Sequence, residues 1–287
     1  MSFLTGVILL AVVTAVACAL PGVFVVLRRG SMLVDAISHA VFPGIVLGFA
    51  LTRDLDSPLL LLGAAVTGLL VVLGAEFLER TGLIAGDAPQ GLVFPALFSL
   101  GVIAVTLDFG DVHLDTHTVL VGDLNIAAFE QLVVGGIAIG PSYLHVMLGM
   151  LALNALFLTA FWRPLVASTF DRPFATSIGI RTRLLHLSFM LLVALTVTAG
   201  FHAAGAILVI ALVVVPAAVA LLLSRRLVVV IALAVGIAAG GALMGFGAAY
   251  ALDAATSAGM AVTYGILFFV VLGVTALRRR RRVAWNG

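Results

Sequence analysis

Two ionisable side chains, Asp35 and His39, lie four residues apart in the otherwise apolar stretch GSMLVDAISHAVFPG, Gly30–Gly44. Residues four apart share one face of a helix, and Ser31 lies one turn earlier on that face. A carboxylate oxygen and an imidazole nitrogen form a ligand set for Mn²⁺, Zn²⁺ or Fe²⁺. A closed structural site usually has four ligands. Two ligands fit a transport site better, because a transported ion must also leave.

The pair alone is compatible with other interpretations. Asp35 and His39 could form a buried hydrogen bond that ties two helices together. They could also relay protons in a secondary transporter, since ionisable groups within a membrane are costly and usually functional. A hydrolytic site with Ser38 is disfavoured, because Ser38 adjoins His39 and projects about 100° away from it around the helix.

Composition identifies the protein class. The chain has 287 residues, of which 63% are hydrophobic and 10% charged, and its mean hydropathy is +1.29. A soluble domain of this length needs more charge to cover its surface, so we expect an all-α polytopic membrane protein. We expect one transmembrane domain over residues 1–287 with eight or nine helices. The candidate spans are 4–27, 34–51, 58–78, 90–107, 143–162, 184–200, 205–223, 227–250 and 258–277.

The absence of lysine and the presence of a single cysteine exclude several chemistries. All fifteen basic residues are arginine. Without lysine the chain has no GxxxxGK[ST] phosphate loop and no Schiff-base chemistry. The single cysteine, Cys18, has no partner for an intrachain disulfide. We therefore expect neither ATP hydrolysis nor another enzymatic activity in this chain, and no permanently bound cofactor.

The arginines also predict the orientation. With the N-terminus outside, alternating spans place fourteen of the fifteen arginines at cytoplasmic ends and only Arg53 outside. This asymmetry follows the positive-inside rule. The net charge of +2 therefore concerns the lipid bilayer, and we expect no nucleic-acid partner. We expect 108–142 to be external, and 163–183 and the basic tail 278–287 to be cytoplasmic.

Three further histidines are weaker candidates for metal ligands. His113 and His117 lie among aspartates in the predicted external segment, and alternation in an extended chain would place both on one face. His202 lies near the external end of a span. A solvated loop or a partner surface explains the two external histidines at least as well as a metal site does.

Five blocks of the sequence, in the same order, resemble the membrane permease subunits of bacterial ABC importers for zinc, manganese or iron. The blocks are GVFVVLRRGSMLVDAISHAVFPGIVLGFAL, GDAPQGLVFPALFSLGV, LDTHTVLVGDL, STFDRPFATSIGI and AAGAILVIALVVVPAAVA. The resemblance covers roughly residues 20–275. It implies a fold similar to the permeases of vitamin B12 and siderophore importers, located in the bacterial inner membrane.

The resemblance also implies a mechanism and partners. Family members pair as two permease subunits, dock on cytoplasmic ATP-binding subunits and receive metal from an extracytoplasmic binding protein. Asp35 and His39 match the Asp–His pair of the family, so a divalent metal ion is expected as substrate. His202 stands where glutamine is more usual, so it could add a ligand. A proton-coupled secondary transporter remains the alternative.

The segment TFDRPFATSIG matches the part of these permeases that docks on the ATPase. We expect Phe170 to Gly179 to form a short helix there. Asp171 would cap it by accepting from backbone N–H groups of the first turn, and Pro173 is favoured near such a start. Phe174 would be among the residues that contact the ATPase.

Overall fold

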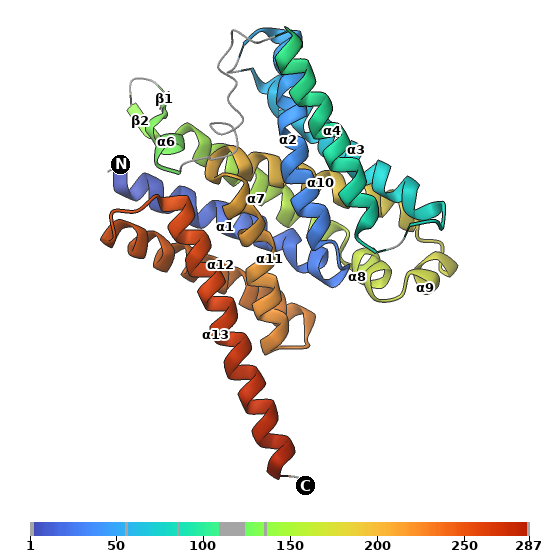
Figure 1. Ribbon diagram of the computed structural model, residues 1–287. Coiled ribbons are helices and arrows are strands. Elements are labelled where there is room, and N and C mark those ends of the chain that lie inside the picture. The colour runs from blue at the N-terminus through green and yellow to red at the C-terminus, as the bar shows by residue number, and fades with distance from the viewer. Residues whose placement is uncertain (1–2, 55–56, 85, 109–123, 135–136, 286–287) are drawn as a thin grey trace. The chain divides into compact units, whose positions relative to one another are not determined.

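The computed structural model describes residues 3–54, 57–84, 86–108, 124–134 and 137–285. Long helices dominate this part of the chain (Figure 1). The helices are α1 (Phe3–Leu27), α2 (Ser31–Thr52), α3 (Pro58–Arg80), α4 (Ala88–Asp108), α6 (Leu124–Phe129), α7 (Ser142–Ala160), α8 (Trp162–Phe170), α9 (Arg172–Ser177), α10 (Thr182–Ala204), α11 (Ala206–Leu223), α12 (Leu227–Ala251) and α13 (Thr256–Trp285).

Nine of the helices within the described residues are long and apolar enough to cross a membrane. Each corresponds to one predicted span, so the expectation of an all-α polytopic protein is confirmed. A short antiparallel hairpin of β1 (Gln131–Val134) and β2 (Ile137–Pro141) follows α6. The hairpin lies in the stretch that we expected to be external, and it is too short to cross a bilayer.

The helices fall into two compact units that interleave along the sequence. The first comprises residues 1–26, 123–151 and 207–287, and the second comprises 27–122 and 152–206. In the first unit α12 and α13 form an antiparallel hairpin. Their packing depends on Gly241 and Gly245, where an added Cβ would meet Tyr264 and Met260. The expectation of a single domain stays a prediction.

In the second unit α2 packs on α3 and α4, and α10 packs on α2 and α3 (Figure 1). Glycine allows α2 and α3 to approach closely. A Cβ at Gly44 would lie 2.3 Å from the Cα of Ala64, and a Cβ at Gly63 would lie 2.4 Å from the carbonyl oxygen of Gly44. Small residues at such contacts are typical of helix pairs in membranes. The helix that carries Asp35 and His39 is therefore held tightly along one side.

Pro43 interrupts the hydrogen-bond ladder of α2 next to this contact. Proline has no N–H, so the carbonyl of His39 has no helical donor, and the neighbouring carbonyls are disturbed. The hydroxyl of Thr67, in α3, donates to the carbonyl oxygen of Ala40 at 2.7 Å. Buried polar groups in a membrane need such internal partners. Thr67 thus stabilises α2 at its proline.

Away from the helices that it packs against, α4 is largely exposed. Phe94 and Phe98 of α4 contact His39 and Phe42 of α2. Several large apolar side chains of α4 remain exposed, among them Leu92, Leu100, Ile103 and Leu107. These side chains have the composition expected of a lipid-facing or subunit-facing surface.

Candidate metal site and coupling segment

Asp35 and His39 are on one face of α2, as their spacing predicts. The oxygen Oδ1 of Asp35 and the nitrogen Nε2 of His39 are 3.6 Å apart, and the two side chains are 34% and 37% exposed. Most of their neighbours on the helix are buried. The pair is therefore a partly open polar spot on an otherwise buried stretch of helix.

The distance between the two atoms bears on the interpretation as a hydrogen bond. An N–H···O bond is usually 2.7–3.2 Å long, so 3.6 Å is too long for a good one. Two ligand atoms of a tetrahedral ion lie about 3.4 Å apart when each bond is about 2.1 Å. In addition, both residues belong to one helix, so the pair does not tie two helices together. Small side-chain movements would suffice to place both atoms on one ion.

Two contacts fix the surroundings of the pair. The ring of Phe94 stacks on the imidazole of His39, with centroids 5.3 Å apart and planes 21° apart. This stacking covers one face of the imidazole and leaves the nitrogen at its edge available. Ser38 is buried, and its hydroxyl donates to the carbonyl oxygen of Val34 at 2.9 Å. Ser38 therefore points away from the pair, as the helical geometry predicted.

Asp35 and His39 are two candidate ligands, fewer than the four of a closed site. Among the described residues no group of three or more His, Cys, Asp or Glu side chains could hold a metal ion. His202 is exposed in the last turn of α10, and it does not join Asp35 and His39 in such a group. His113 and His117 lie outside the described residues.

The stretch 163–183, which includes the segment expected to dock on the ATPase, is formed largely by two short helices, not one. Phe170 ends α8, and α9 covers Arg172 to Ser177. The expectation of one helix from Phe170 to Gly179 was therefore too long. Helix α7 ends just before Phe161, and Pro164 in the first turn of α8 favours a new helix start. Sequence reasoning missed α8, although Pro164 was the available signal.

Local interactions define both ends of α9. The carboxylate oxygen Oδ1 of Asp171 accepts from the backbone N–H of Phe174 at 2.9 Å, which confirms the expected cap. At the other end the N–H of Ile180 donates to the carbonyl of Ala175, and the N–H of Gly179 donates to that of Thr176, both at 3.1 Å. This is a Schellman motif. Gly179 has φ +87°, a conformation that favours glycine.

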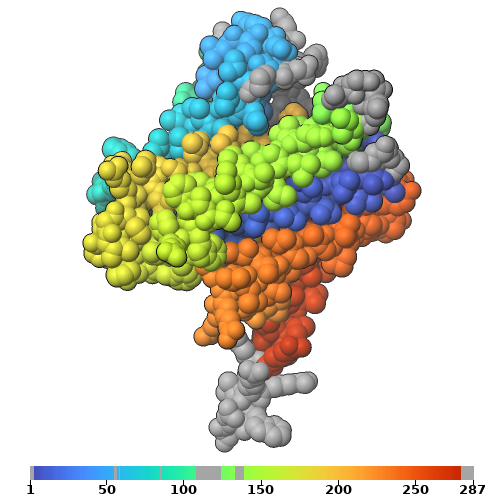
Figure 2. All heavy atoms as spheres, turned by 180° about the vertical axis from the view of Figure 1, so that it is seen from behind, coloured from blue at the N-terminus to red at the C-terminus, as the bar shows by residue number. Residues whose placement is uncertain are grey.

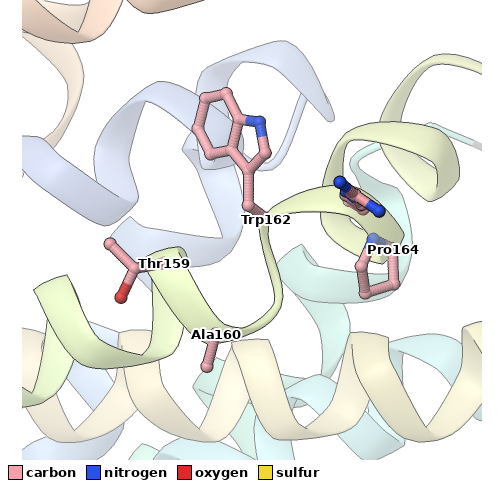
Figure 3. A pocket seen from close by; sticks show the side chains of 5 residues that line it. Thr159, Ala160, Trp162 and Pro164 are labelled. Atoms are coloured by element: carbon pink, nitrogen blue, oxygen red, sulfur yellow. The ribbon is translucent and has the colours of Figure 1, made fainter.

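Large apolar side chains are exposed in and next to α9. Phe174 within α9, and Phe170 and Ile178 on either side of it, are each more than half exposed. Figure 2 shows the segment in yellow, uncovered on the side in view. Figure 3 shows the junction of α7 and α8, where Trp162 projects from the turn. A pocket at this junction is lined by Thr159, Ala160, Trp162, Arg163 and Pro164, and none of these is a typical metal ligand.

Sequence reasoning also missed the role of Arg28, which served only to predict orientation. Its guanidinium contacts α8 and α10, which lie about 140 to 160 residues further along the chain. Its place directly before the Asp–His helix was the only signal available.

Comparisons with known proteins give a consistent result. The model of the ABC 3 transport family matches residues 1–275. The chain is 46% identical to the zinc transport system membrane protein TroD of Treponema pallidum over 92% of this chain and 72% of that protein. It is 36% identical to the manganese transport system membrane protein MntD of Bacillus subtilis, over 93% and 90%. The solved structure of PsaBC from Streptococcus pneumoniae in complex with Fab is similar with a TM-score of 0.76 and 26% identity, over 94% and 91% of the two chains.

Proposed function

The chain belongs to the ABC 3 transport family, and we propose from this membership that it is the transmembrane subunit of an ATP-driven importer of a divalent transition-metal ion. The observation that carries the proposal is the match over nearly the whole chain to permeases of zinc and manganese transport systems. The ion is zinc, manganese or iron. The membrane is the bacterial inner membrane.

Asp35 and His39 hold the ion during its passage. Their ligand atoms are close enough to share one ion, and their partial exposure leaves a route for entry and exit. Because one described chain supplies only two ligands, a second copy of the permease supplies the others. Two copies related by a twofold axis give two carboxylates and two imidazoles, enough for a four-coordinate ion. Partial coordination within each subunit keeps the ion exchangeable.

A separate ATP-binding subunit drives the cycle, because this chain has no lysine for a phosphate loop. The contact is made by α9 together with Phe170 of α8. Burial of an exposed phenylalanine side chain is worth about 1.5–3 kcal/mol. Phe170 and Phe174 are therefore suitable anchors for an apolar groove on the partner, and Asp171 and Gly179 hold α9 in the shape that presents them.

The remaining partner is an extracytoplasmic metal-binding protein, which delivers the ion to the outer face. The N-terminus lies outside and the C-terminus in the cytoplasm, so the hairpin of β1 and β2 is on the side that meets this protein. The comparisons lend no support to the alternative of a proton-coupled secondary transporter.

The test is metal accumulation in cells that lack this gene, with and without the gene restored on a plasmid. Zinc, manganese and iron are limited one at a time, and cell metal is measured by mass spectrometry. We expect restored accumulation of one of these metals, and we expect the restoration to vanish when the Walker lysine of the partner ATPase is replaced. Accumulation that survives loss of the ATPase would favour the secondary transporter. No change in any metal would refute the transport proposal.

A further inference from the structure

Arg28 lies in the turn between α1 and α2 and contacts two distant helices of the same unit. Its Nε donates to the hydroxyl of Thr169 and its Nη2 to the hydroxyl of Ser168, each at 3.0 Å. Nη1 lies 3.5 Å from Nδ1 of His186, and the guanidinium lies over the ring of Phe189, 5.0 Å from its centroid. The side chain thus joins the turn to the end of α8 and to α10.

The surroundings of the Arg28 cation are unusual, because no carboxylate among the residues that the structure describes forms an ion pair with it. Its neighbours are hydroxyls, an imidazole and an aromatic ring. Burial and the nearby Arg172 lower the pKa of Arg28 to about 10. Arg28 is therefore still cationic at neutral pH, and its hydrogen bonds are charge-assisted and strong.

The hydroxyls that accept from Arg28 are themselves held in place. Those of Ser168 and Thr169 donate to the carbonyl oxygen of Leu165, at 3.1 and 2.7 Å. Each hydroxyl therefore donates within α8 and accepts from Arg28, so its hydrogen-bonding direction is fixed. Because Leu165 is fully buried, the receiving end of the contact is part of the core of the unit.

On the C-terminal side of Arg28 the turn leads directly into α2, so a displacement of the turn also displaces the start of this helix. Arg29 adopts a left-handed conformation with φ +58°, and the carbonyl of Gly30 accepts from Leu33 and Val34 to begin α2. Asp35 lies four residues beyond Ser31, a rise of about 6 Å along the helix axis. Displacement of this turn would therefore move Asp35 and His39, because little flexible chain lies between the turn and these two residues.

We propose that Arg28 is the positioning residue that mechanically links the ATPase-docking segment to the helix of the metal pair. Ser168 and Thr169 directly precede Phe170 and Asp171, so movement of α8 and α9 with the ATPase pulls on Arg28 and through it on the start of α2. The inference rests on the proposed function. It adds a specific route by which ATP hydrolysis at one end of the permease reaches Asp35 and His39.

The experiment uses the assembled importer, with its ATPase and binding protein, in proteoliposomes. Uptake of Mn²⁺ and of Zn²⁺ is measured separately, together with ATP hydrolysis by the same preparation. In Arg28→Gln we expect the ratio of ions imported to ATP hydrolysed to fall by about tenfold or more, the factor that corresponds to one charge-assisted hydrogen bond. Hydrolysis itself should continue. Arg29→Gln is the matched control, because Arg29 is adjacent, equally charged and exposed, and it should retain the ratio.

The partner side of the contact gives an independent variant. Ser168→Ala combined with Thr169→Ala removes both acceptors and leaves Arg28 intact, so it should lower the ratio in the same way. A triple variant combines Arg28→Gln with Ser168→Ala and Thr169→Ala. If Arg28 acts through these hydroxyls, the ratio of ions imported to ATP hydrolysed in the triple variant should be no lower than in the more impaired of the two parent variants, because mutations in one interaction are non-additive. Should Arg28→Gln fail to assemble, the Ser168/Thr169 variant carries the test alone.

The outcomes distinguish the role of Arg28 from the transport function. A wild-type ratio in the variants that assemble would overturn the role of Arg28 and leave the transport function standing. Multiplying effects in the triple variant would overturn the route through Ser168 and Thr169. Absence of ATP-dependent uptake of either ion by the wild-type complex would refute the proposed function itself for these ions.

Discussion

Pro43 of α2 and Gly101 of α4 are packed so closely that a side chain at position 101 has no room. A Cβ there would lie 2.8 Å from both the Cα and the Cβ of Pro43. This contact holds α4 against α2 one turn beyond His39. The stacking of Phe94 on His39 depends on the same pair of helices, so the contact contributes to the shape of the candidate metal site.

Gly101→Ala should therefore destabilise the protein. Overpacking of a filled contact costs about 1–3 kcal/mol, more than the roughly 0.5–1 kcal/mol that alanine gains over glycine within a helix. Gly91→Ala is the matched control, since Gly91 belongs to the same helix and an added Cβ there would meet nothing within 4 Å. The measurement is thermal unfolding in detergent. A Gly101→Ala protein as stable as Gly91→Ala would show that α4 is not held by this contact.

The fold was largely predictable from the sequence because each crossing needs a long apolar run, and such runs are visible without knowledge of tertiary contacts. The same holds for the cap at Asp171, which is a local interaction between residues three apart. The pairing of Arg28 with Ser168, and of Phe94 with His39, joins residues far apart in the chain. No local pattern encodes such a contact, so sequence reasoning missed both.

Asp35→Asn is the sharpest test of the metal pair. It keeps the size of the side chain and removes the negative charge of the proposed ligand. We therefore expect metal uptake to fall by at least about tenfold, which corresponds to about 1.4 kcal/mol. His39→Ala should have a similar effect, because each variant removes one ligand. Uptake is measured in cells with matched amounts of permease in the membrane.

Ser38→Ala is the control for these variants, since Ser38 lies between the two residues and its hydroxyl bonds only within the helix. It should transport normally. Near-normal uptake by Asp35→Asn would remove the ligand assignment and return the pair to a structural role.

The capping role of Asp171 predicts a difference between two substitutions. Asp171→Ala removes the acceptor for the N–H of Phe174 and should destabilise the first turn of α9 by about 1 kcal/mol. Asp171→Asn keeps an oxygen that can accept. Stimulation of the ATPase by the permease should therefore fall in the alanine variant and be largely kept in the asparagine variant. Phe174→Ala should lower stimulation without a change in the helix.

The measurement is ATP hydrolysis by the reconstituted complex at several ATPase concentrations, because weakened docking can be overcome by excess partner. Equal stimulation by wild type, Asp171→Ala and Phe174→Ala would exclude α9 as the docking element.

The orientation is tested by single introduced cysteines. The native Cys18 is buried, so it should give little background with a membrane-impermeant maleimide. Cysteines at Asp54 and Ala254, in turns that follow α2 and α12, should be labelled from outside intact cells. A cysteine at Ser224, after α11, should be labelled only after permeabilisation. Labelling of Ser224→Cys in intact cells would reverse the assignment of the N-terminus to the outside.

The exposure of α4 has a consequence for the metal pair. This helix presents several large apolar side chains to its surroundings and at the same time places Phe94 on the imidazole of His39. Changes in bilayer thickness tilt helices that lipid surrounds. A tilt of α4 would move the aromatic ring that orients the imidazole. Acyl-chain length and growth temperature should therefore influence the geometry of the candidate metal site, in addition to their usual effect on the stability of a membrane protein.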